Sequence, residues 1–241
     1  MPTSRSKRVL RGVMLWLLFC AAIGLLLWLE LRTLPKPEAE MRAAAPQLLD
    51  AKKVVVVIAH PDDAEYWISG TLAMLDNLDA RVVLVVASDG EKGRNLINAP
   101  DLAVARRAEQ VAAGSVLGYD EIVFLGQPDR AAADNPDVPR MVREVLEKEQ
   151  PDTVITFDGR KPQLPYLHPD HEAIGRLAVW VVKELDFSPE VYLFHTRRPD
   201  ISVDITSVAA RKIEGMRKHV SQNGGRAMRR STDEWFRALK K

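Results

Sequence analysis

The stretch VVVVIAHPDD, residues 54–63, places a run of β-branched residues directly before a histidine and two aspartates. Such continuous runs are typical of a strand that is buried on both faces of a parallel sheet. Comparable apolar runs recur at residues 82–87, 122–125, 153–157 and 191–194. Segments with helical character separate them, at residues 62–78, 104–117, 138–149 and 172–185. This alternation predicts an α/β fold with a Rossmann-like, doubly wound and mostly parallel sheet.

A second short motif, HPDH at residues 168–171, follows the loop after the fourth predicted strand. Polar residues also follow the second and third strands, as SDGE at residues 88–91 and GQPD at residues 126–129. Because parallel strands present their carboxyl ends at one edge of the sheet, we expect all these residues to lie close together. No Gly-x-Gly-x-x-Gly follows the first strand, so the usual dinucleotide-binding fingerprint is absent.

The two histidine motifs offer the ligands of a metal site. His60 and Asp63 can reach one ion from a single tight turn, and His171 can close the site from the second motif. Two histidines and one carboxylate leave a position open for water, as in catalytic rather than structural zinc sites. We therefore predict a Zn²⁺ site, with another divalent ion as the alternative, since this ligand set is not exclusive to zinc.

The remaining residues of the motifs suit catalysis. Asp62 could accept a proton as a general base, and His168 could donate a proton to a developing oxyanion. Asp170 could orient a histidine through its second ring nitrogen. The alternative is that each motif only caps a helix, because Asp favours the N-cap and Pro the first turn. Outside the motifs, Glu65 is predicted to be a solvated helix residue and His195 a structural one.

An N-terminal segment, residues 12–29, contains no charged residue and is rich in Leu, Trp and Ile. A helix of this length spans about 27 Å, close to the hydrocarbon thickness of a bilayer. The sequence thus predicts a single-pass transmembrane helix within an anchor at residues 1–33, a linker at residues 34–50, and a catalytic domain at residues 51–241. A cleaved signal segment and a buried core helix are the alternatives. Preceding basic residues favour a cytoplasmic N-terminus and an extracytoplasmic catalytic domain: Arg5, Lys7, Arg8 and Arg11.

Composition excludes several classes of protein. The net charge of +1 gives no indication of nucleic-acid binding. The only cysteine, Cys20, lies in the N-terminal apolar segment, so neither a disulfide framework nor a thiolate zinc cluster can form within one chain. With 46% hydrophobic residues, the chain has enough apolar side chains to build a full core.

Residues 52–225 resemble the LmbE-like deacetylase family, which includes the N-acetylglucosaminyl-phosphatidylinositol (PIG-L-type) deacetylases. The resemblance extends over many ordered motifs. They are AHPDD at residues 59–63, GTL at residues 70–72, SDGEKG at residues 88–93, Arg106 with Glu109, FLG at residues 124–126 with Asp129, HPDH at residues 168–171 and HVSQ at residues 219–222.

The resemblance implies zinc-dependent removal of an acyl group, usually acetyl, from the nitrogen of an amino sugar. It gives the ligand role to His60, Asp63 and His171, the base role to Asp62 and the oxyanion role to His168, and it suggests sugar contacts at Arg106, Asp129 and Tyr166. The expected partners are an N-acetylated or lipid-linked sugar, and the membrane through the N-terminal helix. The alternatives are a zinc amidase acting on a larger conjugate and a sugar- or lipid-binding protein without turnover.

Overall fold

A computed structural model describes residues 4–32, 39–160, 168–227 and 232–239 of the chain. The chain divides into two compact units, Met1–Lys36 and Pro37–Lys241. The first unit consists of one helix, α1 (Ser4–Arg32). Two short helices, α2 (Ala39–Ala43) and α3 (Ala45–Leu49), form within the residues predicted as a linker. Both helices belong to the second unit, in which Arg42 of α2 donates to Asp233 of β7 at 2.7 Å.

The structure corrects the prediction of a transmembrane helix at residues 12–29. Among the residues that the structure describes, no helix combines the length and the apolar character that a membrane crossing needs. A membrane crossing requires about 20 predominantly apolar residues in succession. The prediction of a single-pass membrane protein with an extracytoplasmic catalytic domain depended on that helix and is overturned with it. The predicted membrane partner is left without support.

The second unit is built on one mixed sheet of seven strands in the order β3-β2-β1-β4-β5-β7-β6. The strands are β1 (Lys53–Ile58), β2 (Arg81–Ser88), β3 (Glu121–Gln127), β4 (Thr153–Phe157), β5 (Glu190–Phe194), β6 (Ile201–Asp204) and β7 (Asp233–Ala238). β1 pairs in parallel with both β2 and β4, whereas β7 is antiparallel to both β5 and β6. The architecture is consistent with a Rossmann-like fold.

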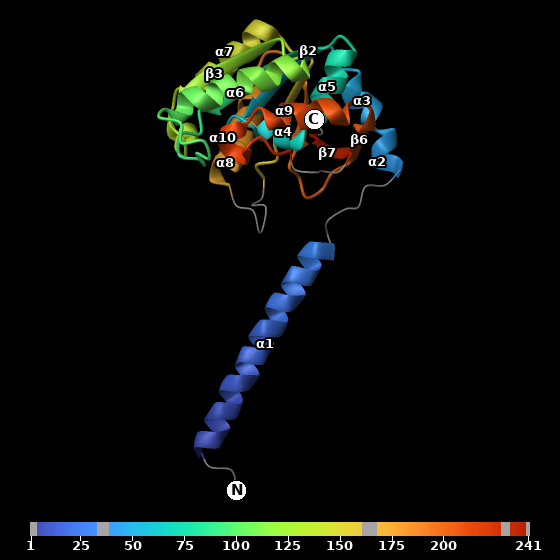
Figure 1. The fold of residues 1–241 in the computed structure, drawn as a ribbon. Helices are drawn as coiled ribbons and strands as arrows, with labels where there is room; N and C mark the ends of the chain where they lie inside the picture. The colour runs from blue at the N-terminus through green and yellow to red at the C-terminus, as the bar shows by residue number, and fades with distance from the viewer. Residues whose placement is uncertain (1–3, 33–38, 161–167, 228–231, 240–241) are drawn as a thin grey trace. The chain divides into compact units, whose positions relative to one another are not determined.

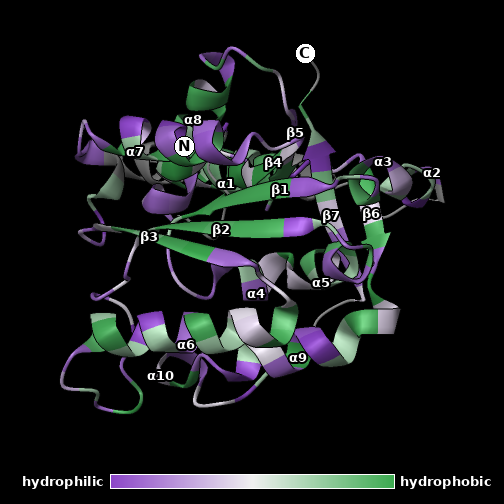
Figure 2. Cartoon of the chain, turned by 90° about the horizontal axis from the view of Figure 1, so that it is seen from above, coloured by the Kyte–Doolittle hydropathy of each residue, from purple (hydrophilic) through white to green (hydrophobic). Residues whose placement is uncertain are grey.

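The core forms where the sequence is most apolar. Every residue from Val54 to Ile58 and from Val82 to Val86 is completely buried, because both faces of these strands are covered. Figure 2 shows this as continuous green along β1 and β2 in the middle of the sheet. β-branched side chains fit such a doubly covered pleated surface well, and burial of each contributes about 1.5–3 kcal/mol.

Helices cover both faces of the sheet (Figures 1 and 2). One face is covered by α7 (Val138–Glu149) and α8 (Pro169–Lys183). The other is covered by α5 (Ser69–Asn77), with α6 (Leu102–Leu117) and α9 (Ala209–Arg217) lying side by side beyond it. The remaining short elements are α4 (Asp63–Trp67), α10 (Val220–Asn223) and the 3-10 turns Ala132–Asp134 and Thr206–Val208.

β6, β7 and the helices between them were not predicted from the sequence. β7 alternates buried and more exposed residues and includes Glu234, which is 3% exposed. One continuous helix was predicted at residues 62–78, but the structure breaks it at Ile68 into α4 and α5. The reason is tertiary: Glu234 accepts hydrogen bonds from the backbone N–H groups of Gly70 and Thr71, at 3.0 and 2.7 Å. A carboxylate from β7 therefore caps a new helix start.

We expect Glu234 to be a major contributor to stability. It forms a buried ion pair with Lys212 of α9 in addition to capping α5. Glu234→Ala should lower the free energy of unfolding by about 3–5 kcal/mol, because it leaves the Lys212 ammonium buried without a counterion. Urea denaturation followed by circular dichroism measures this loss.

A matched control is Glu214→Ala, which removes an exposed partner of Lys218. It should shift the urea midpoint far less than Glu234→Ala, because exposed ion pairs contribute little to stability. A Glu234→Leu, Lys212→Met double variant should recover part of the loss. Equal effects of Glu234→Ala and Glu214→Ala would contradict the assignment.

Candidate metal and catalytic site

The two histidine motifs meet at the carboxyl edge of the sheet. His60 follows β1, and His168 directly precedes α8, which follows β4. Since β1 and β4 are neighbours where the strand order reverses, this edge is the topological switch point at which α/β sheets bind ligands. A cavity of about 350 Å³ lies there. It is lined by His60, Asp62, Asp63, Lys92, Gly93, Arg94, Arg106, Asp129, Arg130, His168, His171 and Gln222.

His60 is oriented by carboxylates on both sides of its ring. Its Nε2 lies 3.0 Å from Asp129 Oδ1 and 3.2 Å from Asp170 Oδ2, while its Nδ1 lies 3.7 Å from Asp63 Oδ2. Burial alone would lower the pKa of His60, but these three carboxylates outweigh burial and raise the pKa well above its usual value. The protein around His60 therefore favours a positive charge at this point.

Asp63 joins the two motifs. Its Oδ1 lies 3.0 Å from His171 Nε2, and its Oδ2 accepts a hydrogen bond from the His60 backbone N–H at 2.8 Å. Burial alone would raise the pKa of Asp63, but His171 and His60 hold it well below its usual range. Two ligands at about 2.0–2.1 Å from a tetrahedral ion lie about 3.3 Å apart. The spacings of Asp63 from His171 Nε2 and from His60 Nδ1 lie on either side of that value, so Asp63 stands where it could share an ion with a histidine.

Aromatic stacking fixes the second motif. The ring of His171 stacks on Phe157 of β4 at a centroid distance of 4.1 Å, and His168 stacks on His171 at 3.9 Å. Burial, helped by the neighbouring imidazoles of His171 and His60, lowers the pKa of His168 to about 4. His168 is therefore neutral at pH 7, and its ring has one N–H group to donate.

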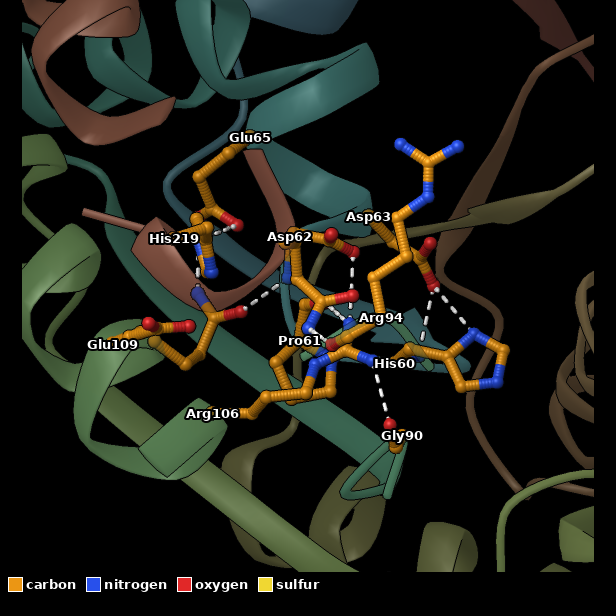
Figure 3. A network of polar contacts seen from close by, with 12 residues as sticks. His60, Pro61, Asp62, Asp63, Glu65, Gly90, Arg94, Arg106, Glu109 and His219 are labelled. Atoms are coloured by element: carbon orange, nitrogen blue, oxygen red, sulfur yellow. Dashed lines mark hydrogen bonds and ion pairs between the residues drawn. The ribbon is translucent and has the colours of Figure 1, made fainter. Parts of the chain in front are cut away.

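Asp62 is held in an unusual backbone conformation, with φ at 90°. Arg106, which is 4% exposed, donates to the backbone oxygens of Pro61 and Gly90 and lies 3.3 Å from Asp62 Oδ1 (Figure 3). About a third of the Asp62 side-chain surface remains open. Even so, burial raises the pKa of Asp62, and the charges of Arg106 and His219 oppose that rise. Asp62 thus combines access to the cavity with a raised proton affinity.

Gly90 makes this grip of Arg106 possible. It has φ at +64°, which favours glycine, and a Cβ there would lie 2.1 Å from Arg106 Nη1. The SDGE sequence after β2 therefore serves to admit an arginine from α6 beneath the first histidine motif.

A buried polar network supports the backbone of Asp62. The side-chain oxygen of Gln110 accepts the Asp62 N–H at 3.0 Å, and its amide group donates to Glu65 at 3.0 Å. Glu65 also pairs with His219 Nε2 at 3.1 Å and accepts from the Tyr119 hydroxyl at 3.0 Å. Burial alone would lower the pKa of His219, but Glu65 raises it. Figure 3 shows Glu65 and His219 directly beside the first motif.

The expectation that Glu65 is a solvated helix residue is wrong, because its side chain is 1% exposed. The sequence contained a signal for this network in the HVSQ motif, but it gave no partner for His219.

Among the described residues two groups could hold a metal ion, and the predicted set of His60, Asp63 and His171 is neither of them. His60, His168 and His171 form one group of converging donor atoms, and His60, Asp129 and Asp170 form another. The fold and this site together define an α/β protein with a candidate divalent-metal centre at its topological switch point.

Of the three predicted sugar-contact residues, Arg106 and Asp129 line the cavity, and both also contact other parts of the protein. Arg106 is buried against backbone oxygens, and Asp129 contacts His60 while also accepting the Lys92 N–H at 3.0 Å. Burial alone would raise the pKa of Asp129. Its contacts with His60 and with the Lys92 N–H outweigh burial and lower the pKa of Asp129 to about 2. Tyr166 lies outside the described residues. Two residues of the cavity wall, Arg94 and Arg130, were not predicted, because each lies one residue beyond the SDGEKG or GQPD segment.

The chain belongs to the PIG-L family, described as GlcNAc-PI de-N-acetylase, whose model matches residues 55–182. This confirms the resemblance seen in the sequence.

Individual proteins that are similar to this chain share 25–29% sequence identity with it. A diacetylchitobiose deacetylase of Thermococcus kodakarensis is 29% identical over 72% of this chain and 71% of its own length. Among solved structures, an N,N'-diacetylchitobiose deacetylase of Pyrococcus horikoshii in complex with an inhibitor is 25% identical. It has a TM-score of 0.69 over 85% of this chain and 94% of that one. A 4-carboxy-2-hydroxymuconate hydratase of Pseudomonas putida is also 25% identical, with a TM-score of 0.63 over 72% of this chain and 81% of that one.

The network predicts that Gln110 contributes more to stability than an exposed polar residue of α6. Gln110→Leu should lower the free energy of unfolding by about 1–3 kcal/mol, because the Asp62 N–H loses its acceptor and Glu65 loses one of its donors. Ser115→Ala, on the same helix but exposed, should be near neutral. Guanidinium denaturation compares the two variants, and indistinguishable midpoints would show that the network contributes nothing to stability.

Proposed function

We propose that this chain is a divalent-metal hydrolase that removes an N-acyl group, principally N-acetyl, from an amino sugar, with Zn²⁺ as the metal. The observation that supports the proposal is the convergence of His60, Asp63 and His171 beside Asp62 in one cavity. Membership of a family described as a de-N-acetylase, and similarity to diacetylchitobiose deacetylases, favour this chemistry over others.

In this proposal His60 binds the ion through Nδ1. Its Nε2 lies within hydrogen-bonding distance of both Asp129 and Asp170, so the ring proton belongs on Nε2 and the lone pair on Nδ1. Asp63 and His171 Nε2 complete the set, and Asp170 with Asp129 orients the first histidine. A bound divalent ion lowers the pKa of water and polarises a carbonyl group.

The reaction uses the chain's own residues for proton transfer. Asp62 takes a proton from the attacking water on its carboxylate and passes it to the leaving nitrogen. Arg106 holds one oxygen of Asp62 and so orients the other toward the cavity. The neutral imidazole of His168 donates its N–H to the oxygen of the tetrahedral centre. The products are a carboxylate and a free amine.

Relatives with this fold do not all hydrolyse amides, since the similar Pseudomonas protein is a hydratase. The test is therefore the chemistry itself. The full-length protein, loaded with Zn²⁺, is incubated with N-acetylglucosamine and with its β-1,4-linked dimer, and free acetate and primary amine are measured. We expect equimolar release of both, abolished by a chelator and restored by the metal. Failure to release acetate from any N-acetyl sugar would overturn the proposal.

The metal ligands can be tested without activity. Elemental analysis of the protein should find about one divalent ion per chain, and a His60→Ala, His171→Ala double variant should contain almost none. Asp129→Asn tests whether Asp129 orients His60, as proposed, or binds the ion itself, as in the group of His60, Asp129 and Asp170. We expect it to retain the ion with affinity weakened about 10- to 100-fold, as for an orienting residue. Complete loss of the ion in Asp129→Asn would instead make that carboxylate a ligand.

The base is tested by Asp62→Asn. This change preserves size and hydrogen bonding but removes the proton acceptor, so turnover should fall by about 10²-fold or more. Metal content should stay near one ion per chain, as determined by the same elemental analysis. If metal and activity are lost together, Asp62 is a ligand and the division of roles is wrong.

A further inference from the structure

The walls of the cavity carry more positive charge than its carboxylates need. Each lining carboxylate already has a cationic or imidazole partner. Asp62 lies 3.3 Å from Arg106, Asp63 lies 3.0 Å from His171, and Asp129 lies 3.0 Å from His60.

Arg94 and Arg130 also line the cavity, and both are exposed. Within the described ranges, neither has a carboxylate within ion-pair distance.

Two arginines outside the cavity, Arg107 and Arg140, do have carboxylate partners. Arg107, one residue after Arg106, makes two hydrogen bonds to Asp89, at 2.7 and 2.8 Å. Arg140 on α7 lies against Glu144. These two arginines outside the cavity are therefore paired with carboxylates, whereas Arg94 and Arg130 are not. The two arginines on the cavity wall face a space that a substrate would enter.

The loops that carry these arginines are fastened to each other. The Lys92 ammonium donates to the Asp129 backbone oxygen at 2.7 Å, and the Asp129 N–H donates to Glu91 at 3.0 Å. Gln222 of α10 donates to the backbone oxygen of Arg94 at 2.6 Å. The backbones of both loops are thereby fixed before any ligand arrives, which lowers the entropic cost of binding. In Figure 3 Arg94 extends along the same side of the site as Asp62 and Asp63.

We propose that Arg94 and Arg130 bind an anionic group, a phosphate or a carboxylate, which the amino sugar carries in addition to its N-acyl group. The planar guanidinium donates two parallel hydrogen bonds to such oxyanions, which a neutral sugar hydroxyl cannot match. The reacting amide occupies the His60–Asp63–His171 end of the cavity, and the anion lies against the arginine wall. This inference rests on the proposed function and narrows its substrate to acidic N-acyl sugars.

The test compares three substrates that differ in charge. They are the methyl glycoside of N-acetylglucosamine, which is neutral, N-acetylglucosamine 1-phosphate and N-acetylmuramic acid, which carries a carboxylate. The Zn²⁺-loaded wild-type protein should have a kcat/KM at least about tenfold higher for one of the anionic sugars. The anionic sugar that is preferred tells phosphate from carboxylate. Added salt should reduce the preference, because it screens exposed charges.

Arg94→Gln and Arg130→Gln should each lower kcat/KM for the preferred anionic sugar by about tenfold, mainly through KM. Turnover of the neutral glycoside should change less than about twofold, because neither arginine takes part in catalysis. Arg140→Gln is the matched control on α7 and should leave every substrate unchanged. Equal kcat/KM for neutral and anionic sugars, or equal losses on all three in the arginine variants, would overturn the inference.

Binding separates this inference from the proposed function. Calorimetry with glucosamine 1-phosphate and with muramic acid, the products that the anionic sugars would yield, needs no turnover. Affinity for one of these ligands that falls about tenfold in Arg94→Gln and in Arg130→Gln would support the anion site even if no N-acetyl sugar is hydrolysed. Turnover of the neutral glycoside without any arginine-dependent binding would leave the proposed function standing and remove the anion site.

Discussion

The parallel pairing of β1 with β4 is the constraint on which the rest of this structure depends. Val57 lies opposite Thr156, so the two strands end side by side, and the residues that follow each strand enter one cavity. His60 and His171 are far apart in sequence, and only this register lets Asp63 contact both histidines. The pairing is strong because β1 is covered on both faces and fully buried, which a one-residue slip would disturb at every position.

Concentrating carboxylates at that edge creates an electrostatic demand. Asp63, Asp129 and Asp170 all approach His60, and none is more than 7% exposed. Buried carboxylates of this kind are stable only beside positive charge, which a protonated imidazole or a metal ion supplies. The same demand accounts for the buried Arg106 beneath Asp62 and for the His219–Glu65 pair behind it. Charge neutralisation therefore extends from the metal-ligand candidates into the supporting helices.

Local sequence was a good guide to the elements that face one environment. The five apolar strands and α7 lie within a few residues of their predicted bounds, because their burial pattern repeats along the chain. It was a poor guide where a distant residue decides the local structure. The break at Ile68 exists because Glu234 caps α5, and Glu65 is buried because α6 and α10 supply its partners. Neither partner is visible in the segment that it alters. The prediction of a transmembrane helix at residues 12–29 rested on apolar composition alone and was wrong.

The sequence by itself determined the alternating α/β order, the family and the candidate ligands, because these depend on residue type and on short spacings such as that of His60 and Asp63. The tertiary structure alone decided what surrounds them. It placed Arg106 beneath Asp62, set Asp129 against His60, and left Arg94 and Arg130 on the exposed wall of the cavity. Such roles depend on which side chains from separate loops meet, and the packing of the folded chain fixes those distances.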